Sequence, residues 1–173
     1  MLYTRKGDSG TTKTFGCDQR VSKSSAIAEA LGSLDEINSL LGLCKIKSAK
    51  AELIGGVQQT LFIIQAELAG ADKTVTEEKV KAVEAVIDEV EKKLPPIKTF
   101  FVSGGTEVAS LFDFARTVAR RAERRVVQVN EEGVRKMGEH SMAYLNRLSS
   151  LLYALARLVN HESGITEEPP TYK

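Results

Sequence analysis

The sequence predicts an all-α protein, an up-and-down bundle of five helices behind an irregular amino-terminal arm. Apolar residues recur at spacings of three and four along five long segments, which is the period of an amphipathic helix. The connections between these segments are short, and several contain the glycines and prolines that end helices. No alternation of apolar and polar residues persists long enough to indicate a half-buried β-strand. These patterns favour helices packed on helices around one core.

The arm and the first two helices follow from local composition. Residues 3–20 are rich in Gly, Thr, Ser and Asp, so we expect a loop or a short ordered arm there. The first helix is predicted from about Ser24 to Cys44, with Asn38 on its apolar face and Asp35 on the flank of that face. The second helix is predicted from about Ala51 to Ala69.

The last three helices have clearer limits. The third begins after the cap residue Thr76 and stops at Pro95-Pro96. The segment Ile97–Gly105 leads into a fourth helix, expected at about Thr106–Asn130. A turn then precedes the fifth helix, expected at about Gly138–Asn160.

We expect these elements to form a single domain over residues 1–173. It divides into an arm of residues 1–22, a helical bundle of residues 24–162 and a tail of residues 163–173. The tail contains Pro169-Pro170 and is predicted to be extended and loosely held. A chain of 173 residues is long enough for one domain with a sizeable core.

Composition narrows the function classes. The 24 lysines and arginines nearly balance the 23 aspartates and glutamates, which argues against a general nucleic-acid or membrane-surface binder. Cys17 and Cys44 form no metal-type pair, and nothing at the start resembles a secretory signal. No apolar run approaches the roughly 20 residues needed to cross a bilayer. We therefore expect a soluble, cytoplasmic protein whose cysteines are inert packing residues.

The segment from Arg116 to Arg125 carries five arginines and one glutamate within a helix whose other face is apolar. At about 100° per residue, Arg116, Arg120 and Glu123 form a narrow stripe, and Arg124 lies at its edge. Guanidinium groups offer rigid donor forks that match phosphate oxygens, so the stripe indicates a polyanion site. A solvated or salt-bridged helix face is an equally available interpretation.

The arm is the second candidate site. Its two glycines, Gly7 and Gly10, allow successive amides to point at one anion, while neighbouring threonines and lysines add hydroxyl donors and charge. Lys23, just before the first helix, is positioned to add to the same site. The segment lacks the Gly-Lys-Ser/Thr ending and preceding strand of a Walker A loop. A Gly-Asp-Ser-Gly turn taken alone is more often a surface turn.

Other polar positions leave alternatives open. Asn38 and Asp35 are suited either to holding a partner helix or, for Asn38, to a hydrogen-bonded place in the core. Asn146 either contacts a nucleotide or caps a neighbouring chain. The glycines that follow Phe100 expose amides that suit an anion, although the aromatic residues there are equally suited to plugging the end of the bundle. His140 and His161 lie far apart in the sequence, and we assign neither them nor any other residue to a metal site.

Taken together, these features resemble the PduO-type ATP:cob(I)alamin adenosyltransferases. The resemblance covers nearly the whole chain in matching order, and its motifs are Thr4-Arg-Lys-Gly-Asp-Ser-Gly-Thr11, Arg20 with Lys23, Gly32-Ser-Leu-Asp-Glu-Ile-Asn38, Phe100 through Gly105, Arg120-Arg-Ala-Glu-Arg-Arg125 and Tyr144-Leu-Asn-Arg-Leu-Ser149. Each motif alone is moderately specific, but their conjunction is strong. One departure is Ser103, which stands where the family pattern has a proline before the paired glycines.

The resemblance implies a homotrimer of ferritin-like five-helix bundles with ATP held between neighbouring subunits. The implied ATP-binding residues are Thr4, Arg5, Lys6, Gly7, Asp8, Gly10, Thr11, Thr12, Lys13, Lys23, Arg120, Arg121, Glu123, Arg124 and Asn146. The implied cobalamin-binding residues are Phe100, Asp35 and Asn38. Asp35 would pair with Arg116 across the interface, and Arg120, Asp35 and Arg116 are the residues to which the resemblance gives catalytic roles.

The implied reaction transfers the 5′-deoxyadenosyl group of ATP, supplied with Mg²⁺, to the cobalt of cob(I)alamin and releases triphosphate. Because the reduced cobalt is itself the nucleophile, the protein needs to position the reactants and stabilise the leaving group. A reductase and an adenosylcobalamin-dependent enzyme are possible partners. The alternatives are a non-catalytic ATP-binding bundle and, more weakly supported, a helical nucleic-acid-binding protein.

Overall fold

The computed structural model describes residues 3–15 and 19–172, and within them it contains five α-helices and one β-hairpin. The all-α prediction is confirmed, and the helices lie within a few residues of their predicted limits. The elements are β1 (Thr11–Lys13), β2 (Arg20–Ser22), α1 (Ala26–Lys47), α2 (Ala51–Ala69), α3 (Glu77–Glu91), α4 (Glu107–Glu131) and α5 (Glu139–Glu162).

The hairpin is an element that the sequence did not predict. β1 and β2 pair antiparallel, with Thr11 opposite Ser22 and Lys13 opposite Arg20. Each strand has three residues, which is too short for an alternating pattern to stand out in the sequence. The expectation of a short ordered arm was therefore right, and the absence of strands was wrong.

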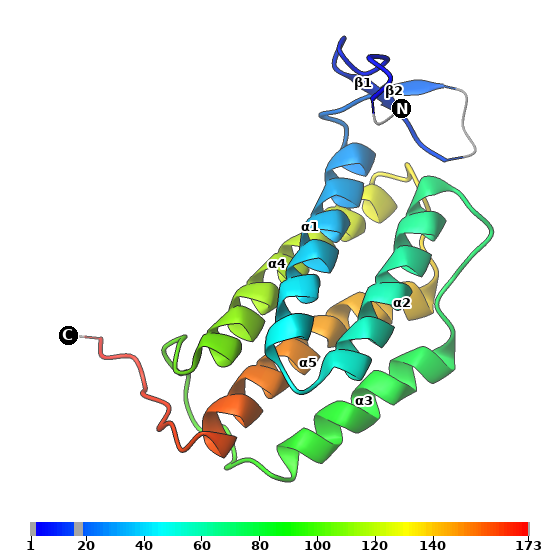
Figure 1. The fold of residues 1–173 in the computed structure, drawn as a ribbon. Helices are drawn as coiled ribbons and strands as arrows, with labels where there is room; N and C mark the ends of the chain where they lie inside the picture. The colour runs from blue at the N-terminus through cyan, green and yellow to red at the C-terminus, as the bar shows by residue number, and fades with distance from the viewer. Residues whose placement is uncertain (1–2, 16–18, 173) are drawn as a thin grey trace.

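The helices form a bundle around α1, α4 and α5 (Figure 1). α4 packs against both α1 and α5, α2 packs against α1, and α3 packs against α5. The hairpin projects beyond the amino end of α1, at the end of the bundle where α4 terminates (Figure 1). Within one chain, the arm therefore lies at one end of the bundle, away from the middle of α4.

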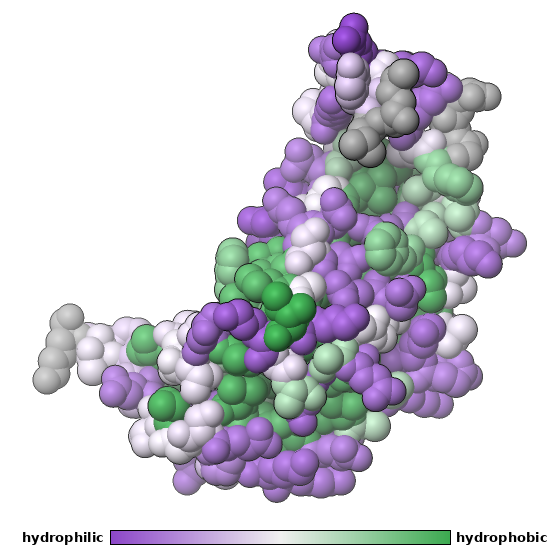
Figure 2. All heavy atoms as spheres, viewed as in Figure 1, coloured by the Kyte–Doolittle hydropathy of each residue, from purple (hydrophilic) through white to green (hydrophobic). Residues whose placement is uncertain are grey.

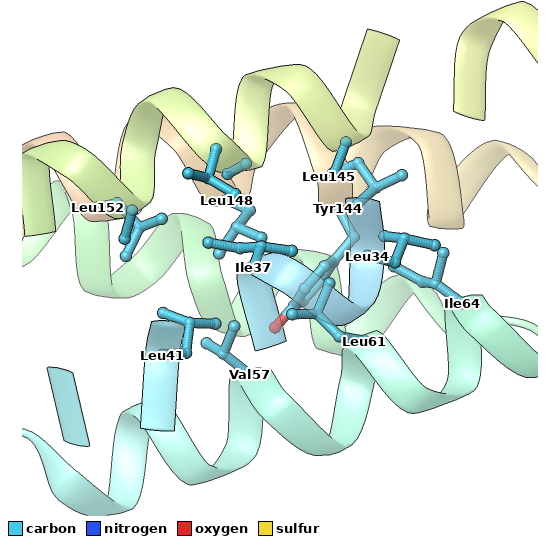
Figure 3. Packing of buried hydrophobic residues seen from close by; sticks show 14 of the residues in the cluster. Leu34, Ile37, Leu41, Val57, Leu61, Ile64, Tyr144, Leu145, Leu148 and Leu152 are labelled. Carbon is cyan, nitrogen blue, oxygen red and sulfur yellow. The ribbon is translucent and has the colours of Figure 1, made fainter. Parts of the chain in front are cut away.

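The core consists of aliphatic side chains that interdigitate between helices, as Figure 3 shows for α1, α2 and α5. Leu34, Ile37 and Leu41 of α1 are at most 1 % exposed, and they meet apolar residues three and four positions apart on the neighbouring helices. Burial of each such side chain contributes about 1.5–3 kcal/mol. Tyr144 lies among them, and burial raises the pKa of its hydroxyl despite a hydrogen bond with Thr60.

α4 faces the core with four alanines among larger apolar side chains such as Phe112. Ala109, Ala115, Ala119 and Ala122 are all at most 1 % exposed, which lets the backbone of α4 approach α1 and α5 closely. Thr106 caps this helix by accepting a hydrogen bond from the amide of Ala109 at 3.1 Å. The arginines are consequently left on the outer side of α4.

Polar and apolar surfaces alternate on the molecule. Figure 2 shows hydrophilic side chains over much of the arm and over the outer side of α3, with hydrophobic residues reaching the surface between them. Ile46 of α1, Phe62 of α2 and Phe114 of α4 are each more than half exposed. Within the part of the chain that the structure describes, no helix is long and apolar enough to cross a membrane.

The carboxyl-terminal tail is extended, as predicted, but it is not loosely held. Arg157 of α5 is 5 % exposed and donates from Nε to Glu167 at 2.9 Å. The amide of Val102 donates to the carbonyl oxygen of Glu168 at 2.9 Å. The sequence pattern identified the prolines of the tail but gave no sign of its long-range partners.

Cys44 is the one cysteine among the described residues, since Cys17 lies outside them. It is fully buried, and burial raises the pKa of its thiol from 9.0 to about 11. Because the thiolate is the reactive form, we expect iodoacetamide at pH 8 to leave Cys44 unmodified in the folded protein and to alkylate it in urea. Peptide mapping by mass spectrometry measures this site separately, and rapid alkylation of native Cys44 would contradict the expectation.

Candidate functional site

The arm is folded into a compact turn before the hairpin. The amide of Asp8 donates to the carbonyl of Arg5 at 3.2 Å, and the amide of Gly10 donates to the carbonyl of Gly7 at 3.1 Å. Arg5 and Gly10 have positive φ angles of 59° and 77°. Such turns direct several backbone amides to one side, which is the geometry of an anion cradle.

Lys23 and Arg20 attach this turn to the start of the bundle. The amide of Lys23 donates to the carbonyl of Gly10 at 2.9 Å, and its ammonium nitrogen lies 3.0 Å from where a Cβ on Gly7 would be. Arg20 donates to both the hydroxyl and the carbonyl oxygen of Thr11 at 2.8 Å and to the carbonyl of Lys6 at 2.5 Å. The positive charge of Lys23 is therefore held against the glycine turn.

A second group of predicted residues meets between α4 and α5. A cleft of about 350 Å³, here called the arginine cleft, is lined by Arg120, Glu123, Arg124, Val127, Gln128, Glu131 and Asn146. Asn146 donates from Nδ2 to Glu123 at 2.9 Å. The cleft thus combines two guanidinium groups with two side-chain amides and two carboxylates. The guanidinium groups suit a phosphate chain, and the amides and carboxylates suit polar groups attached to it.

A chain of polar contacts orients Asn146. Arg147 donates from Nη1 to Oδ1 of Asn146 at 2.6 Å and from Nε to Glu84 of α3 at 2.8 Å. With Nδ2 bound to Glu123 and Oδ1 bound to Arg147, Asn146 can still offer a ligand its second N–H and the second lone pair of Oδ1.

A larger cleft of about 610 Å³ adjoins the first. It is called the loop cleft because residues 97–104 form one wall. The other walls come from α4, α5 and the tail. Their lining residues are Asp113, Arg116 and Arg120 of α4, Ser149, Ser150, Tyr153, Ala156, Arg157 and Asn160 of α5, and Glu167 of the tail. Phe100 on this wall is 79 % exposed, so its ring is available to a ligand.

Arg116 of α4 lies over the ring of Tyr153 of α5, and both side chains line the loop cleft. The guanidinium carbon of Arg116 lies 5.9 Å from the centre of the Tyr153 ring, and its Nε contacts Asp113 at 2.5 Å. Burial raises the pKa of Tyr153, while the nearby charge of Arg157 lowers it. The cleft therefore has an aromatic side beside a charged one.

Arg120 lines both the arginine cleft and the loop cleft. An anion bound in the first and a large planar ligand bound in the second would meet at its guanidinium group.

Comparison with known proteins identifies this arrangement. The family model described as cobalamin adenosyltransferase matches residues 2–159. The chain belongs to the cobalamin adenosyltransferase family. It is 43 % identical over 174 residues to the corrinoid adenosyltransferase PduO of Citrobacter freundii, covering 94 % of this chain and 50 % of that protein. The chain thus spans about half the length of that relative.

Two further comparisons cover most of both chains. A corrinoid adenosyltransferase of Bacillus subtilis is 39 % identical over 176 residues, covering 95 % of this chain and 89 % of that protein. A variant of the PduO-type ATP:corrinoid adenosyltransferase from Lactobacillus reuteri, complexed with cobalamin and ATP, superposes with a TM-score of 0.93 at 29 % identity. That superposition covers 99 % of this chain and 97 % of the other.

The family's predicted site residues are not all brought together within one chain. Asp35 on α1 is exposed, whereas Arg116 pairs with Asp113 on its own helix. Arg121 forms an ion pair with Glu36 of α1, outside both cleft linings. The pairing of Asp35 with Arg116 and the binding role of Arg121 remain predictions.

Asn38 also lies apart from the two clefts. It is 5 % exposed, and within the described part of the chain no donor reaches its Oδ1, while its carbonyl accepts from Gln58 at 3.0 Å. Its predicted contact with cobalamin remains a prediction.

Sequence reasoning left several site residues of this family member without a role. A polar stripe on α5 runs through Asn146, Ser150, Tyr153 and Arg157, and three residues further it reaches Asn160. Helical spacing puts the first four on one face of α5, and of these only Asn146 has a role predicted from the sequence. Extending the same spacing would have found Asn160, which lines the loop cleft. Glu84 and Glu167 gave no local signal.

Proposed function

We propose that this protein transfers the 5′-deoxyadenosyl group of ATP to the cobalt of cob(I)alamin, forming adenosylcobalamin and triphosphate. The observation that carries the proposal is the position of Arg120 in both clefts. The reduced cobalt donates an electron pair to the 5′ carbon of ATP, a cobalt–carbon bond forms, and the carbon–oxygen bond to the triphosphate breaks with its electrons on the leaving oxygen. The protein's task is to align the two substrates and stabilise that charge.

Each group of residues has a part in this reaction. The amides of the arm turn, with Lys23, bind the triphosphate, and Mg²⁺ enters with ATP as part of the substrate. Arg120 and Arg124 neutralise the charge that grows on the leaving group, while Asn146 and Glu123 position the nucleoside. Phe100 and Tyr153 offer aromatic surfaces to the corrinoid in the loop cleft.

The proposal includes a homotrimer in which the arm of one subunit completes the clefts of its neighbour. The arm projects from the amino end of α1 (Figure 1). Arg120, by contrast, lies near the middle of α4, which runs from Glu107 to Glu131. A neighbouring copy would supply the missing half of the site, and exposed Asp35 would then reach Arg116. A reductase, a consumer of adenosylcobalamin and a cytoplasmic location complete the proposal.

The decisive test is an anaerobic assay of the purified protein with MgATP and chemically reduced cobalamin. The visible spectrum reports adenosylcobalamin, and ion-exchange chromatography reports triphosphate. Both products, each dependent on both substrates, are expected. ATP binding without either product would overturn the transferase proposal in favour of a non-catalytic ATP-binding protein, and failure to bind ATP would overturn the site itself.

The orientation of Asn146 provides a separate prediction. Replacement of Arg147 by Met removes the donor to Asn146 Oδ1 and the pair with Glu84, so we expect the Kd for MgATP to rise about fivefold to tenfold. Glu84→Gln keeps an acceptor for Arg147 and is expected to have a smaller effect. Isothermal titration calorimetry measures both, and an unchanged Kd in the folded Arg147 variant would contradict the role of this contact chain.

A further inference from the structure

The loop of residues 95–106, here called the cleft loop, forms the wall of the loop cleft that carries Phe100. It has no regular secondary structure before α4 begins at Glu107. Gly104 and Gly105 near its end have positive φ angles of 139° and 104°. A segment of this kind keeps one conformation when other parts of the protein bind its backbone groups.

Asn160 binds the end of this loop with both ends of its amide. Nδ2 donates to the carbonyl oxygen of Gly104 at 2.9 Å, and Oδ1 accepts from the amide of Thr106 at 3.1 Å. The side chain is 6 % exposed, so these two bonds are shielded from water. Asn160 therefore binds the backbone on both sides of Gly105 and fixes the entrance to α4, whose cap is Thr106.

Gly105 fits closely against this amide. A Cβ on Gly105 would lie 2.2 Å from Oδ1 of Asn160, well inside contact distance. The positive φ and the close approach together require glycine at this position. The turn can therefore accommodate the Asn160 amide only because residue 105 has no side chain.

Arg157, one turn earlier on α5, holds the first part of the loop. It donates from Nη2 to the carbonyl oxygen of Pro95 at 3.3 Å, and its guanidinium carbon lies 5.1 Å from the centre of the Phe101 ring. Glu167 neutralises the charge of Arg157 through an ion pair in which Oε2 lies 2.9 Å from Nε. The carbonyl oxygen of the adjacent Glu168 accepts a hydrogen bond from the amide of Val102. Both ends and the middle of the cleft loop are therefore anchored to α5 or to the tail.

We propose that Asn160 is a positioning residue for the corrinoid side of the site, and that with Arg157 it preorganises the cleft loop so that Phe100 faces the ligand. The inference rests on the proposed function. Asn160 lies beyond residues 2–159, which the family model matches. Phe100 is 79 % exposed, so its own contacts with the chain do little to hold it, and the anchors of the neighbouring backbone set its place.

Loss of the anchors reduces the fraction of molecules whose loop is ready to bind, and the measured affinity falls by that fraction. Removal of the Asn160 amide leaves a buried donor and a buried acceptor without their partner. We expect Asn160→Ala to weaken corrinoid binding about tenfold. The affinity for ATP, whose predicted ligands lie in the arm and the arginine cleft, should not change.

The experiment compares Asn160→Ala and Asn160→Asp with the control Glu162→Ala, which changes an exposed residue in the same last turn of α5. Asp keeps the acceptor for Thr106 but places a carboxylate oxygen against the carbonyl of Gly104. Three quantities are measured: hydrogen exchange of the backbone amides of residues 97–106, the Kd of cob(II)alamin with MgATP present, and the Kd of MgATP alone.

In both Asn160 variants we expect faster exchange in residues 97–106 and weaker cob(II)alamin binding, with unchanged MgATP affinity. The Glu162→Ala control should change none of the three quantities. Unchanged exchange would overturn the anchoring role, and faster exchange with unchanged cob(II)alamin affinity would overturn its link to the ligand. Equal losses of both affinities would indicate general destabilisation and also overturn the proposal. If the unaltered protein binds no cob(II)alamin, the proposed function fails while the exchange result still decides the anchoring.

Discussion

Replacing Arg120 by alanine is expected to lower kcat for adenosyl transfer by about a hundredfold to a thousandfold, because removal of one donor to a developing oxyanion costs that much. Arg120 is exposed on α4 and lines both clefts, and in the proposed reaction its guanidinium group stabilises the departing triphosphate. Its loss removes no core contact, and the melting temperature should stay near that of the unaltered protein. Anaerobic single-turnover kinetics at saturating substrate separates the chemical step from binding.

Arg125→Ala is the matched control for this variant. Arg125 is exposed on the same helix, and its Nη1 donates to Gln128 at 3.2 Å without lining either cleft. Arg120→Lys keeps the charge but loses the planar donor fork, so an intermediate rate is expected. Unchanged turnover in a well-folded Arg120→Ala protein would remove Arg120 from the mechanism.

The second large effect concerns stability. Glu167→Gln should lower the free energy of unfolding by about 3 kcal/mol, because it leaves the guanidinium group of Arg157 buried without its counter-charge. The side chains of Arg157 and Glu167 are only 6 % and 18 % exposed. Urea denaturation followed by circular dichroism measures the change through the midpoint of unfolding.

Two comparisons isolate the ion pair. Glu168→Gln changes the next residue, whose side chain is exposed and whose bond to Val102 uses the backbone carbonyl, so it should have little effect. The double variant Arg157→Met with Glu167→Gln removes both charges and should regain much of the lost stability. Equal stabilities of Glu167→Gln and Glu168→Gln would show that the pair does not hold the tail to the bundle.

The helices of this protein were predictable because each carries its own signal. Apolar residues at spacings of three and four fixed the core face of α1 and α5, and Thr106 and the glycines near it marked the start of α4. The hairpin was missed because three-residue strands contain too little pattern. The tail was judged loose because its contacts with Arg157 and Val102 are made by residues distant in the sequence.

Parts of the candidate site carry a signal in the sequence. The glycine turn of the arm and the arginine stripe of α4 are local patterns whose chemistry is visible in the residues themselves. The predicted roles of Asp35, Asn38 and Arg121 are not met by contacts within one chain, and they stay predictions. The contacts that orient Asn146 come from Arg147 and from Glu84 of α3, and no spacing rule links α3 to α5.

The sequence by itself determined the helical architecture and a family resemblance that the comparisons confirmed. It also predicted phosphate-type chemistry for the arm and α4. These properties depend on periodicity and on the order of short motifs. Only the tertiary structure decided that Arg120 stands between two clefts and that Asn160 binds the backbone on both sides of Gly105. The reason is physical: packing of α4 on α5 creates these places, and a hydrogen bond between residues more than 50 positions apart leaves no periodic trace in the chain.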